Sequence, residues 1–359
     1  MLFTRAIAVC ISGDAHGPKI VVTMEGLPHD LPLDIDAANQ QLALRQQGAG
    51  SGPRMQMEHD QLQIVSGNWK SRTTGMPLCL EIPNRASNPE KGEVRVVARP
   101  GHADFAAFRR FKNPDLRCYV EGASARRTAG IVAAGGLCKP WLEALDIEVF
   151  AYVSRFAGIE AAPLPADAFP SLFEQREQNP LRMLDVRASQ RAMERLETAR
   201  EKGDTLGGKV RVLARGVPAG LGSYSSAFTR LDALLAANLV GIPAVKQVCF
   251  GDPNVFDLPG SDAHDRFDPA SPSNRLSNRA GGIEGGISNG EALEMEVGFK
   301  PIPTLAKPLD GLDVRRMQVV PGVAVRSDLT AVVRGTIVVE NLVRLVLFDA
   351  LVAEGRITK

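Results

Sequence analysis

The sequence predicts an α+β protein that forms one continuous domain containing two sheets. Apolar and polar residues alternate in several separate segments, which is the pattern of half-buried strands. Amphipathic and mostly apolar helical patterns lie between those segments. No long Gly/Ser linker and no block of charge divides the 359 residues, so we expect a single domain over residues 1–359.

The bulk composition limits the classes of function. Hydrophobic residues make up 44% and charged residues 23% of the chain, which is typical of a globular protein with an ample core. The formal net charge of +1 gives no overall attraction to nucleic acid or to an anionic membrane, so an anion must be bound by a local cluster. No apolar stretch has the length of a signal peptide or a membrane span.

The five cysteines indicate a reducing environment. They are widely spaced and include no Cys-x-x-Cys pair. This pattern favours free thiols in a cytoplasmic protein, and it predicts neither a disulfide framework nor a zinc site.

The predicted strands begin with residues 9–11, a short apolar segment that ends in the turn SGDAHG. Alternating segments predict further strands at residues 94–99, 148–156 and 209–216. In the last of these, Val210 and Val212 share one face while charged residues occupy the other. This arrangement is expected where one face of a sheet is covered by other elements.

Helices are predicted at residues 183–203, 229–241 and 339–355. Gly203 suits the position that follows a helix, because a glycine readily adopts the left-handed conformation found there. The last helix carries a charge about every fourth residue, which excludes a membrane span. It could serve either the core or an interface.

A weak internal repeat is also present. Residues 25–34 and 215–224 share the pattern G-[LV]-P-x-x-L after an apolar strand, and each precedes a helix-like segment. A strand–turn–helix unit used twice would place two related sheets in one body; the alternative is a coincidence of turn chemistry. The Gly-rich segment 45–55 and the segment 300–322, which begins Pro-rich, are expected to be mobile.

Four stretches carry residues that a scaffold does not require. They are RPGHADF at 99–105, an arginine-rich stretch at 109–128, a run with five glycines at 278–293, and RSD at 326–328. Each alone also fits a turn, a solvated face or a surface ion pair. Together they suggest a polyanionic small molecule as substrate, because the planar guanidinium group matches phosphate and carboxylate. Histidines are suited to donating protons to such a substrate.

The ordered set of motifs resembles the chorismate synthase family. The motifs are SGDAHG, RPGHAD, SARRTAG, GVPAGLGS, NRAGGIEGGISNG, KPIPTL and RSD, and they follow the family order from about residue 3 to residue 354. The resemblance implies a β-α-β sandwich in which antiparallel sheets pack around helices. It also implies that the protein assembles as a homotetramer. Its binding partner is then a small-molecule substrate.

The resemblance further implies a carbon–oxygen lyase acting on phosphates. Members of the family convert 5-enolpyruvylshikimate-3-phosphate to chorismate by an anti-1,4 elimination, in the shikimate pathway of aromatic amino acid biosynthesis. They require reduced FMN, which is not consumed overall. Whether this chain reduces its own flavin with NADPH or depends on an external supply stays open at this point.

The resemblance also assigns roles to residues. His16 is expected beside the leaving phosphate, His102 beside the flavin, and Asp328 is expected to act with the flavin in removing the ring proton. Flavin contacts map onto Ser124, Gly285, Lys300, Pro301, Ile302, Pro303, Thr304 and Arg326. Substrate contacts map onto Arg45, Ala125 and Arg126. The glycines at 281–290 and the segment from Lys300 to Thr304 are expected to form one wall of a flavin pocket, and no metal is implied.

Several departures from the family pattern fall inside the site motifs. Asp14 and Ala15 stand where the family turn has Glu and Ser, and Arg127 stands where it has Glu. Ser51 and Gly122 stand where an arginine is common. Since a charge-assisted contact contributes about 1.5–3 kcal/mol, these losses predict weaker affinity for substrate. We also expect Gly122 to resist substitution, on the hypothesis that it has a positive φ.

Two alternatives to an active chorismate synthase follow from these departures. One is a non-catalytic paralogue that binds a flavin or an anion, and the other is an enzyme of related chemistry on another phosphorylated cyclic acid. Retention of His16, His102 and Asp328 favours the active enzyme, because binding alone does not require all three.

Overall fold

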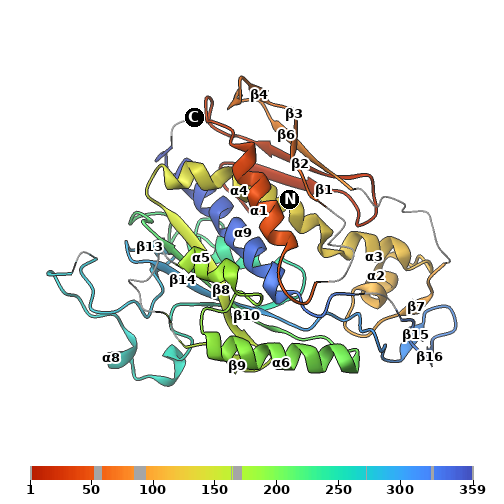
Figure 1. Cartoon of the computed structure of the whole chain (residues 1–359). Coiled ribbons are helices and arrows are strands. Elements are labelled where there is room, and N and C mark those ends of the chain that lie inside the picture. Colours follow the sequence, from red (N-terminus) through yellow and green to blue (C-terminus); the bar gives the residue numbers. More distant parts are fainter. Residues whose placement is uncertain are drawn as a thin grey trace.

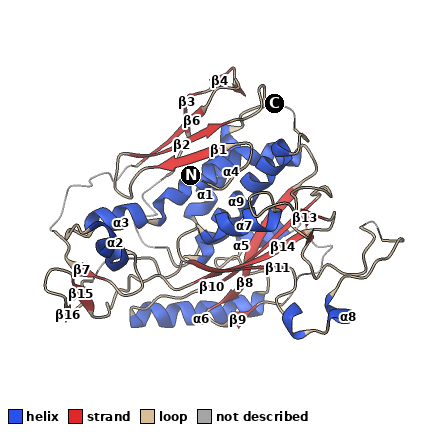
Figure 2. Cartoon of the chain, turned by 180° about the vertical axis from the view of Figure 1, so that it is seen from behind, coloured by secondary structure: helices blue, strands red, loops and turns tan. Residues whose placement is uncertain are grey.

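The computed structural model describes residues 2–51, 59–84, 94–162, 164, 172–271, 273–324 and 327–357. These residues form a sandwich in which helices lie between two antiparallel sheets (Figure 1). The same layers are seen from behind in Figure 2, with one sheet above the helices and the larger sheet below them. The predicted α+β sandwich is confirmed, and one hydrophobic core joins both sheets to the helices.

The first sheet has the strand order β1-β2-β6-β3. Its strands are β1 (Ala8–Ser12), β2 (Lys19–Glu25), β6 (Leu78–Pro83) and β3 (Gln63–Ser66). Alternation in β2 buries Ile20, Val22 and Met24, and β2 contacts helix α4 (Thr128–Glu143). The predicted strand at residues 9–11 is therefore the core of β1.

The second sheet has the strand order β11-β14-β10-β8-β9. Its strands are β8 (Glu148–Phe156), β9 (Ile159–Glu160), β10 (Gly208–Arg215), β11 (Val245–Phe250) and β14 (Leu293–Phe299). The predicted strand at 148–156 coincides with β8, and the one at 209–216 is shifted from β10 by one residue. The predicted strand at 94–99 is mostly wrong, since only Val97–Ala98 form a strand, β7.

Three of the helices between the sheets form the centre of that layer. They are α1 (Ile35–Gln46), α4 (Thr128–Glu143) and α9 (Val332–Ala353). Helix α9 packs against α4 on one side and against β8 and β10 on the other, so nearly all of its residues are buried. At Gly135 a Cβ atom would lie 2.1 Å from the carbonyl oxygen of Asn341, and this glycine therefore permits the close approach of α4 and α9. The last helix was predicted to serve either the core or an interface. Helix α9 lies in the core of its own chain.

The two sheets repeat one topology. The order β1-β2-β6-β3 corresponds to β8-β10-β14-β11, and α1 follows β2 as α7 (Leu231–Val240) follows β10. Helix α4 follows the strands of the first sheet along the chain, and helix α9 follows those of the second sheet. Gly26 and Gly216, which open the shared turns, have φ of +84° and +74°. The repeated strand–turn–helix unit is therefore present in the fold.

The remaining elements lie around this sandwich. Helices α2 (Asp104–Phe111) and α3 (Arg117–Ala123) lie near a small sheet of β7, β15 (Gly311–Asp313) and β16 (Gln318–Val320) at one end of the molecule (Figure 1). Helix α6 (Val186–Lys202) ends at Gly203, whose φ of +69° agrees with its predicted role. The others are α5 (Leu172–Gln178), α8 (Gly260–Ala263), β4 (Asn68–Trp69), β5 (Arg72–Thr73), β12 (Ile283–Glu284) and β13 (Ile287–Ser288).

All five cysteines lie in the described part of the chain and are free thiols. Among the described residues, no helix has both the length and the apolar character needed to cross a membrane. Part of segment 45–55 lies outside the described residues, and segment 300–322 includes β15 and β16. Their mobility stays a prediction.

Candidate active site

The candidate site lies where several element ends meet. The segment that follows α1 is joined to the segment before α9 by a hydrogen bond from Leu329 N to Gly50 O, at 2.9 Å. Leu206 N in turn donates to Leu329 O at 2.8 Å, and the Thr205 hydroxyl donates to Ile302 O at 2.7 Å. These bonds bring the residues after β14 next to the N-terminal end of α9, near α2 and α3 (Figure 1).

Two buried arginines share one carboxylate in this region. Arg126 donates two hydrogen bonds to Asp60, at 2.7 and 2.8 Å, and Arg45 Nη1 lies 3.6 Å from the same carboxylate. Arg45 Nη1 has no hydrogen-bond partner among the described residues. Burial lowers the pKa of Arg45 to about 10, an effect that Asp60 opposes and that the nearby Arg334 and Arg126 increase. Positive charge is therefore concentrated here, as an anion site requires.

Asp328 adjoins this cluster at the start of α9. Arg334 Nη1 and Nη2 donate to its two carboxylate oxygens at 2.9 and 3.2 Å. The Nε of Arg334 also donates to the Ser51 hydroxyl at 3.3 Å. The charge of Asp328 acts on Arg45 as well, so the predicted proton acceptor and a predicted substrate arginine are near each other. Arg326 lies outside the described residues.

His16 lies on the turn between β1 and β2, next to α3. Its Nδ1 is 2.7 Å from Glu121 Oε1, and its backbone N–H donates to Glu121 Oε2 at 2.8 Å. Asn84 links this turn to the arginine cluster, because its Nδ2 donates to Gly17 O at 2.6 Å and its Oδ1 accepts from Arg126 Nε at 2.8 Å. The side chain of His16 is 41% exposed, so the imidazole lies at the rim rather than in the core.

His102 is held by an acid two residues away. Its Nδ1 lies 2.5 Å from Asp104 Oδ1, and Arg99 Nε donates to Asp104 Oδ2 at 2.8 Å. Burial of the Asp104 carboxyl opposes ionisation, but the hydrogen bonds from His102 and Arg99 outweigh this and hold the pKa of Asp104 well below its usual range. Asp104 is therefore an ionised partner for His102.

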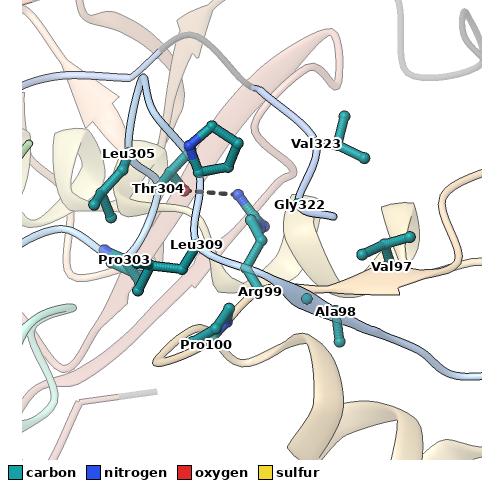
Figure 3. A pocket seen from close by; sticks show the side chains of 12 residues that line it. Val97, Ala98, Arg99, Pro100, Pro303, Thr304, Leu305, Leu309, Gly322 and Val323 are labelled. Carbon is teal, nitrogen blue, oxygen red and sulfur yellow. Dashed lines mark hydrogen bonds between the residues drawn. The ribbon is translucent and has the colours of Figure 1, made fainter. Parts of the chain in front are cut away.

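The Lys300–Thr304 segment packs against the RPGHADF turn. Arg99 Nη1 donates to the Thr304 hydroxyl at 2.7 Å (Figure 3), and Lys300 Nζ donates to Gly101 O. A pocket opens beside this contact, and its lining is mostly apolar. It is lined by Val97, Ala98, Arg99, Pro100, Pro303, Thr304, Leu305, Pro308, Leu309, Gly311, Gly322 and Val323.

The predicted contacts Ser124 and Ala125 lie within the arginine cluster. The Ser124 hydroxyl accepts from Arg126 N at 3.2 Å and so caps the short helical turn η2 (Ala125–Arg127). The carbonyl of Ala125 accepts from Arg45 Nη2 at 3.3 Å. Pro301 and Ile302 continue from the end of β14 toward the pocket.

Gly285 does not join these residues within one chain. It lies at the tip of the hairpin β12–β13, where it has φ of +60° and open space around a would-be Cβ. That hairpin is at the start of β14, whereas Lys300 follows the end of β14. The seven residues of this strand separate the two by about 20 Å, given roughly 3.3 Å per residue. The expected common wall of glycines and Lys300–Thr304 is therefore wrong for a single chain.

The expectation for Gly122 is also wrong. Gly122 lies in α3 and is not among the glycines with positive φ. A Cβ atom there would meet nothing within 4 Å, so a side chain can be accommodated. Arg127 is exposed, in contrast to the buried Arg126.

Three residues of the site were not predicted from the sequence: Asp60, Glu121 and Arg334. The first two meet partners that are 66 and 105 positions away in the chain, Arg126 and His16. No local motif signals such pairs. Arg334 is six positions from Asp328 and lies in the first turn of α9. The helix was predicted to start at residue 339, so the proximity of Arg334 to Asp328 was not recognised from the sequence.

The fold and these contacts define a β-α-β sandwich protein with a buried cluster of arginines around Asp60. Among the described residues there is no group of three His, Cys, Asp or Glu side chains that could hold a metal. A family model described as chorismate synthase matches residues 7–352.

Individual relatives agree with that match. A chorismate synthase of Thermotoga maritima is 44% identical over 342 residues, covering 95% of this chain and 90% of the relative. A chorismate synthase of Limosilactobacillus fermentum is 38% identical and is covered to 92%. A solved structure titled "Crystal Structure of Chorismate Synthase" matches with a TM-score of 0.77 and 29% identity, covering 97% of this chain and 92% of that one. The chain belongs to the chorismate synthase family.

Proposed function

We propose that this chain catalyses the anti-1,4 elimination of phosphate from 5-enolpyruvylshikimate-3-phosphate to give chorismate, as a carbon–oxygen lyase of the shikimate pathway. The observation that carries the proposal is the buried Arg45–Asp60–Arg126 cluster beside Asp328, with His16 linked to it through Asn84. A substrate with a phosphate and carboxylates needs such a concentration of guanidinium groups.

In this proposal each residue of the site has a separate role. Arg45 and Arg126 bind and orient the anionic groups of the substrate. His16, at the rim of the cluster, donates a hydrogen bond to the departing phosphate and offsets its charge. Asp328 accepts the ring proton, and Arg334 keeps its carboxylate oriented.

The apolar surface beside Arg99 supports our proposal that a flavin binds next to it. Its proline, valine and leucine side chains suit a flat ring, and Arg99 and Thr304 supply polar groups at its edge. We propose that reduced FMN is held by Ser124 and the Lys300–Thr304 segment, with His102 hydrogen-bonded near the ring and kept in place by Asp104. When bound, the flavin supplies a transient electron to the substrate.

A second copy of the chain completes the flavin site in this proposal. Gly285 lies at the far end of β14 from Lys300, so its expected flavin contact would come from another protomer of a homotetramer. Two inactive variants, His102→Ala and Gly285→Phe, should recover activity when they are refolded together, because some mixed sites would then be intact. Failure of the mixture, with each variant assembled normally, would contradict a shared site.

We also place the protein in the cytoplasm, which agrees with its five free thiols. The experiment that tests the function is anaerobic phosphate release from 5-enolpyruvylshikimate-3-phosphate with chemically reduced FMN. Replacing the chemical reductant with NADPH decides whether the chain reduces its own flavin. Quenched flavin fluorescence and a raised melting temperature without phosphate release would support the binding-only alternative instead.

A further inference from the structure

We propose that Glu121 is a positioning residue that fixes the imidazole of His16 for its task at the leaving phosphate. This inference rests on the proposed function, because that function gives His16 its task. Glu121 belongs to none of the motifs that define the family resemblance, and it reaches His16 across 105 positions of the chain.

The contact between the two residues has two bonds. One oxygen of Glu121 binds the ring through Nδ1 at 2.7 Å, and the other accepts the backbone N–H of His16 at 2.8 Å. Because one carboxylate holds both the backbone and the ring, it fixes the turn and the ring orientation together. The Glu121 side chain is only 18% exposed, so surrounding side chains restrict its own freedom.

The pairing also assigns the two ring nitrogens. An ionised carboxylate accepts hydrogen bonds and cannot donate one, so Nδ1 of His16 carries the hydrogen in this contact. Glu121 therefore engages Nδ1, and Nε2, which carries the second hydrogen when the ring is protonated, is the nitrogen that donates to the phosphate. His102 is held through Nδ1 by Asp104 in the same manner, so both histidines of the site have a carboxylate on the same ring nitrogen.

Helix α3 couples this contact to the arginine cluster. Glu121 is three residues before Ser124, whose hydroxyl caps the turn that carries Arg126. Asn84 connects Arg126 to Gly17, the residue after His16. His16 is thus tied to a substrate-binding arginine by two routes, one of which depends on Glu121.

The first test compares Glu121→Ala and Glu121→Gln with Glu197→Ala, an exposed acid that pairs with Arg200 on α6. Removing the carboxylate partner of a functional histidine costs about 10–100-fold in metal sites, and we expect a loss of that size in kcat for Glu121→Ala. The KM should change less than about threefold, because the substrate arginines remain. Glu121→Gln should recover part of the rate, since its amide oxygen still accepts from Nδ1. Glu197→Ala should match the parent.

The second test asks whether Glu121 acts through His16. In a His16→Ala background, Glu121→Ala should lower kcat by less than about threefold, because the group that it positions is gone. An equal loss in both backgrounds would overturn the proposal. Nitrogen-15 spectra recorded at a pH where the imidazole is neutral should show the hydrogen on Nδ1 in the parent and its redistribution between Nδ1 and Nε2 in Glu121→Ala; an unchanged spectrum would also overturn the proposal.

The same spectra keep the two proposals separable. A parent protein that releases no phosphate contradicts the proposed function, whereas the nitrogen-15 signals of His16 still report on the contact with Glu121. Thermal unfolding of each variant identifies a loss of rate caused by misfolding, and Glu121→Gln, which keeps the side chain's shape, then decides the case.

Discussion

Arg334 and Asp328 form a two-bond ion pair at the start of α9, with distances of 2.9 and 3.2 Å. The same guanidinium group reaches the Ser51 hydroxyl on the segment that follows α1. Arg334 therefore ties the predicted proton acceptor to the loop that borders the arginine cluster. A planar, two-bond contact of this kind fixes the orientation of a carboxylate as well as its position.

Replacing the acceptor is the first prediction. Asp328→Asn should lower kcat at least about 100-fold, because an amide cannot accept the ring proton. The melting temperature should stay close to that of the parent, since the ion pair is partly exposed and the shape of the side chain is kept. Anaerobic phosphate release and thermal unfolding measure the two effects. A near-parental rate would contradict the role assigned to Asp328.

The two histidines give the second prediction. His16→Ala and His102→Ala should each lower turnover about 10²–10⁴-fold, the usual range for a positioned acid or base. His29→Ala is a control, because His29 lies in the turn after β2 and has no assigned role. If both site variants turn over at the parental rate, their roles are wrong even though the family assignment stands.

Asp104 gives a pH-dependent prediction. Its pKa is lowered in the folded protein, so its ionised form contributes stability above the pKa of the unfolded state, about 3.9. That contribution is lost as the pH falls from there through the lower pKa of the folded state. Asp104→Asn should therefore reduce the free energy of unfolding at pH 7, and the difference from the parent should shrink below about pH 4.

Urea unfolding at pH 7, 5 and 3.5 measures this difference. Asp310→Asn, at an exposed loop position, serves as the control and should stay close to the parent throughout. A gap for Asp104→Asn that is constant over this range would show that the ionised carboxylate adds nothing specific.

The buried cluster gives a prediction on stability. Asp60→Asn leaves Arg126 and Arg45 buried without their shared counter-charge. Removing one partner of a buried ion pair typically costs about 3–5 kcal/mol, and we expect a loss of that size in the free energy of unfolding. The cost should be much smaller in an Arg126→Met background, where one of the two buried charges is absent. Equal costs in both backgrounds would mean that Asp60 is not coupled to Arg126.

The sequence was sufficient to predict those elements whose buried residues follow a regular local pattern. Strands β8 and β10 were predicted to within one residue. Burial alternates along β10, and the sequence pattern records that directly, whereas five consecutive residues of β8 are buried, so its apolar run marks a strand covered on both faces. Helix α9 was predicted seven residues too short at its start. Gly335 and several β-branched residues there disfavour a helix, yet the ring of Phe299 lies 2.6 Å from where a Cβ of Gly335 would be. Packing against β14 requires the glycine, and a local pattern cannot record that contact.

The same distinction applies to the site. His102, Asp104 and Arg99 were recognisable because they lie within six residues of each other. Glu121 and Asp60 were missed because folding, rather than sequence proximity, brings them to His16 and Arg126. The glycine hairpin was expected next to Lys300–Thr304 because both belong to the family's flavin contacts. The length of β14 separates them, and this distance could be known only after the strand had been placed.

The last prediction concerns the arginines that are missing at Ser51 and Gly122. An arginine at position 51 would lie beside Arg334, which already donates to Ser51, so repulsion should reduce its benefit. Gly122 is the better position, because it is helical and nothing lies within 4 Å of a would-be Cβ. One recovered charge-assisted contact of about 1.5 kcal/mol corresponds to roughly a tenfold lower KM. Gly122→Arg should show that gain at low salt.

A matched control separates charge from helix stability. Gly122→Gln gains the same helix propensity, about 0.5–1 kcal/mol over glycine, but adds no charge, so its KM should stay at the parental value. Raising the salt to about 0.5 M should shrink the advantage of Gly122→Arg, since screening weakens an exposed contact with a phosphate. If Gly122→Arg and Gly122→Gln have the same KM at low salt, this end of α3 does not face the anion. The lost arginine is then irrelevant to affinity, and the phosphate must be bound on the side of Arg45 and Arg126 instead.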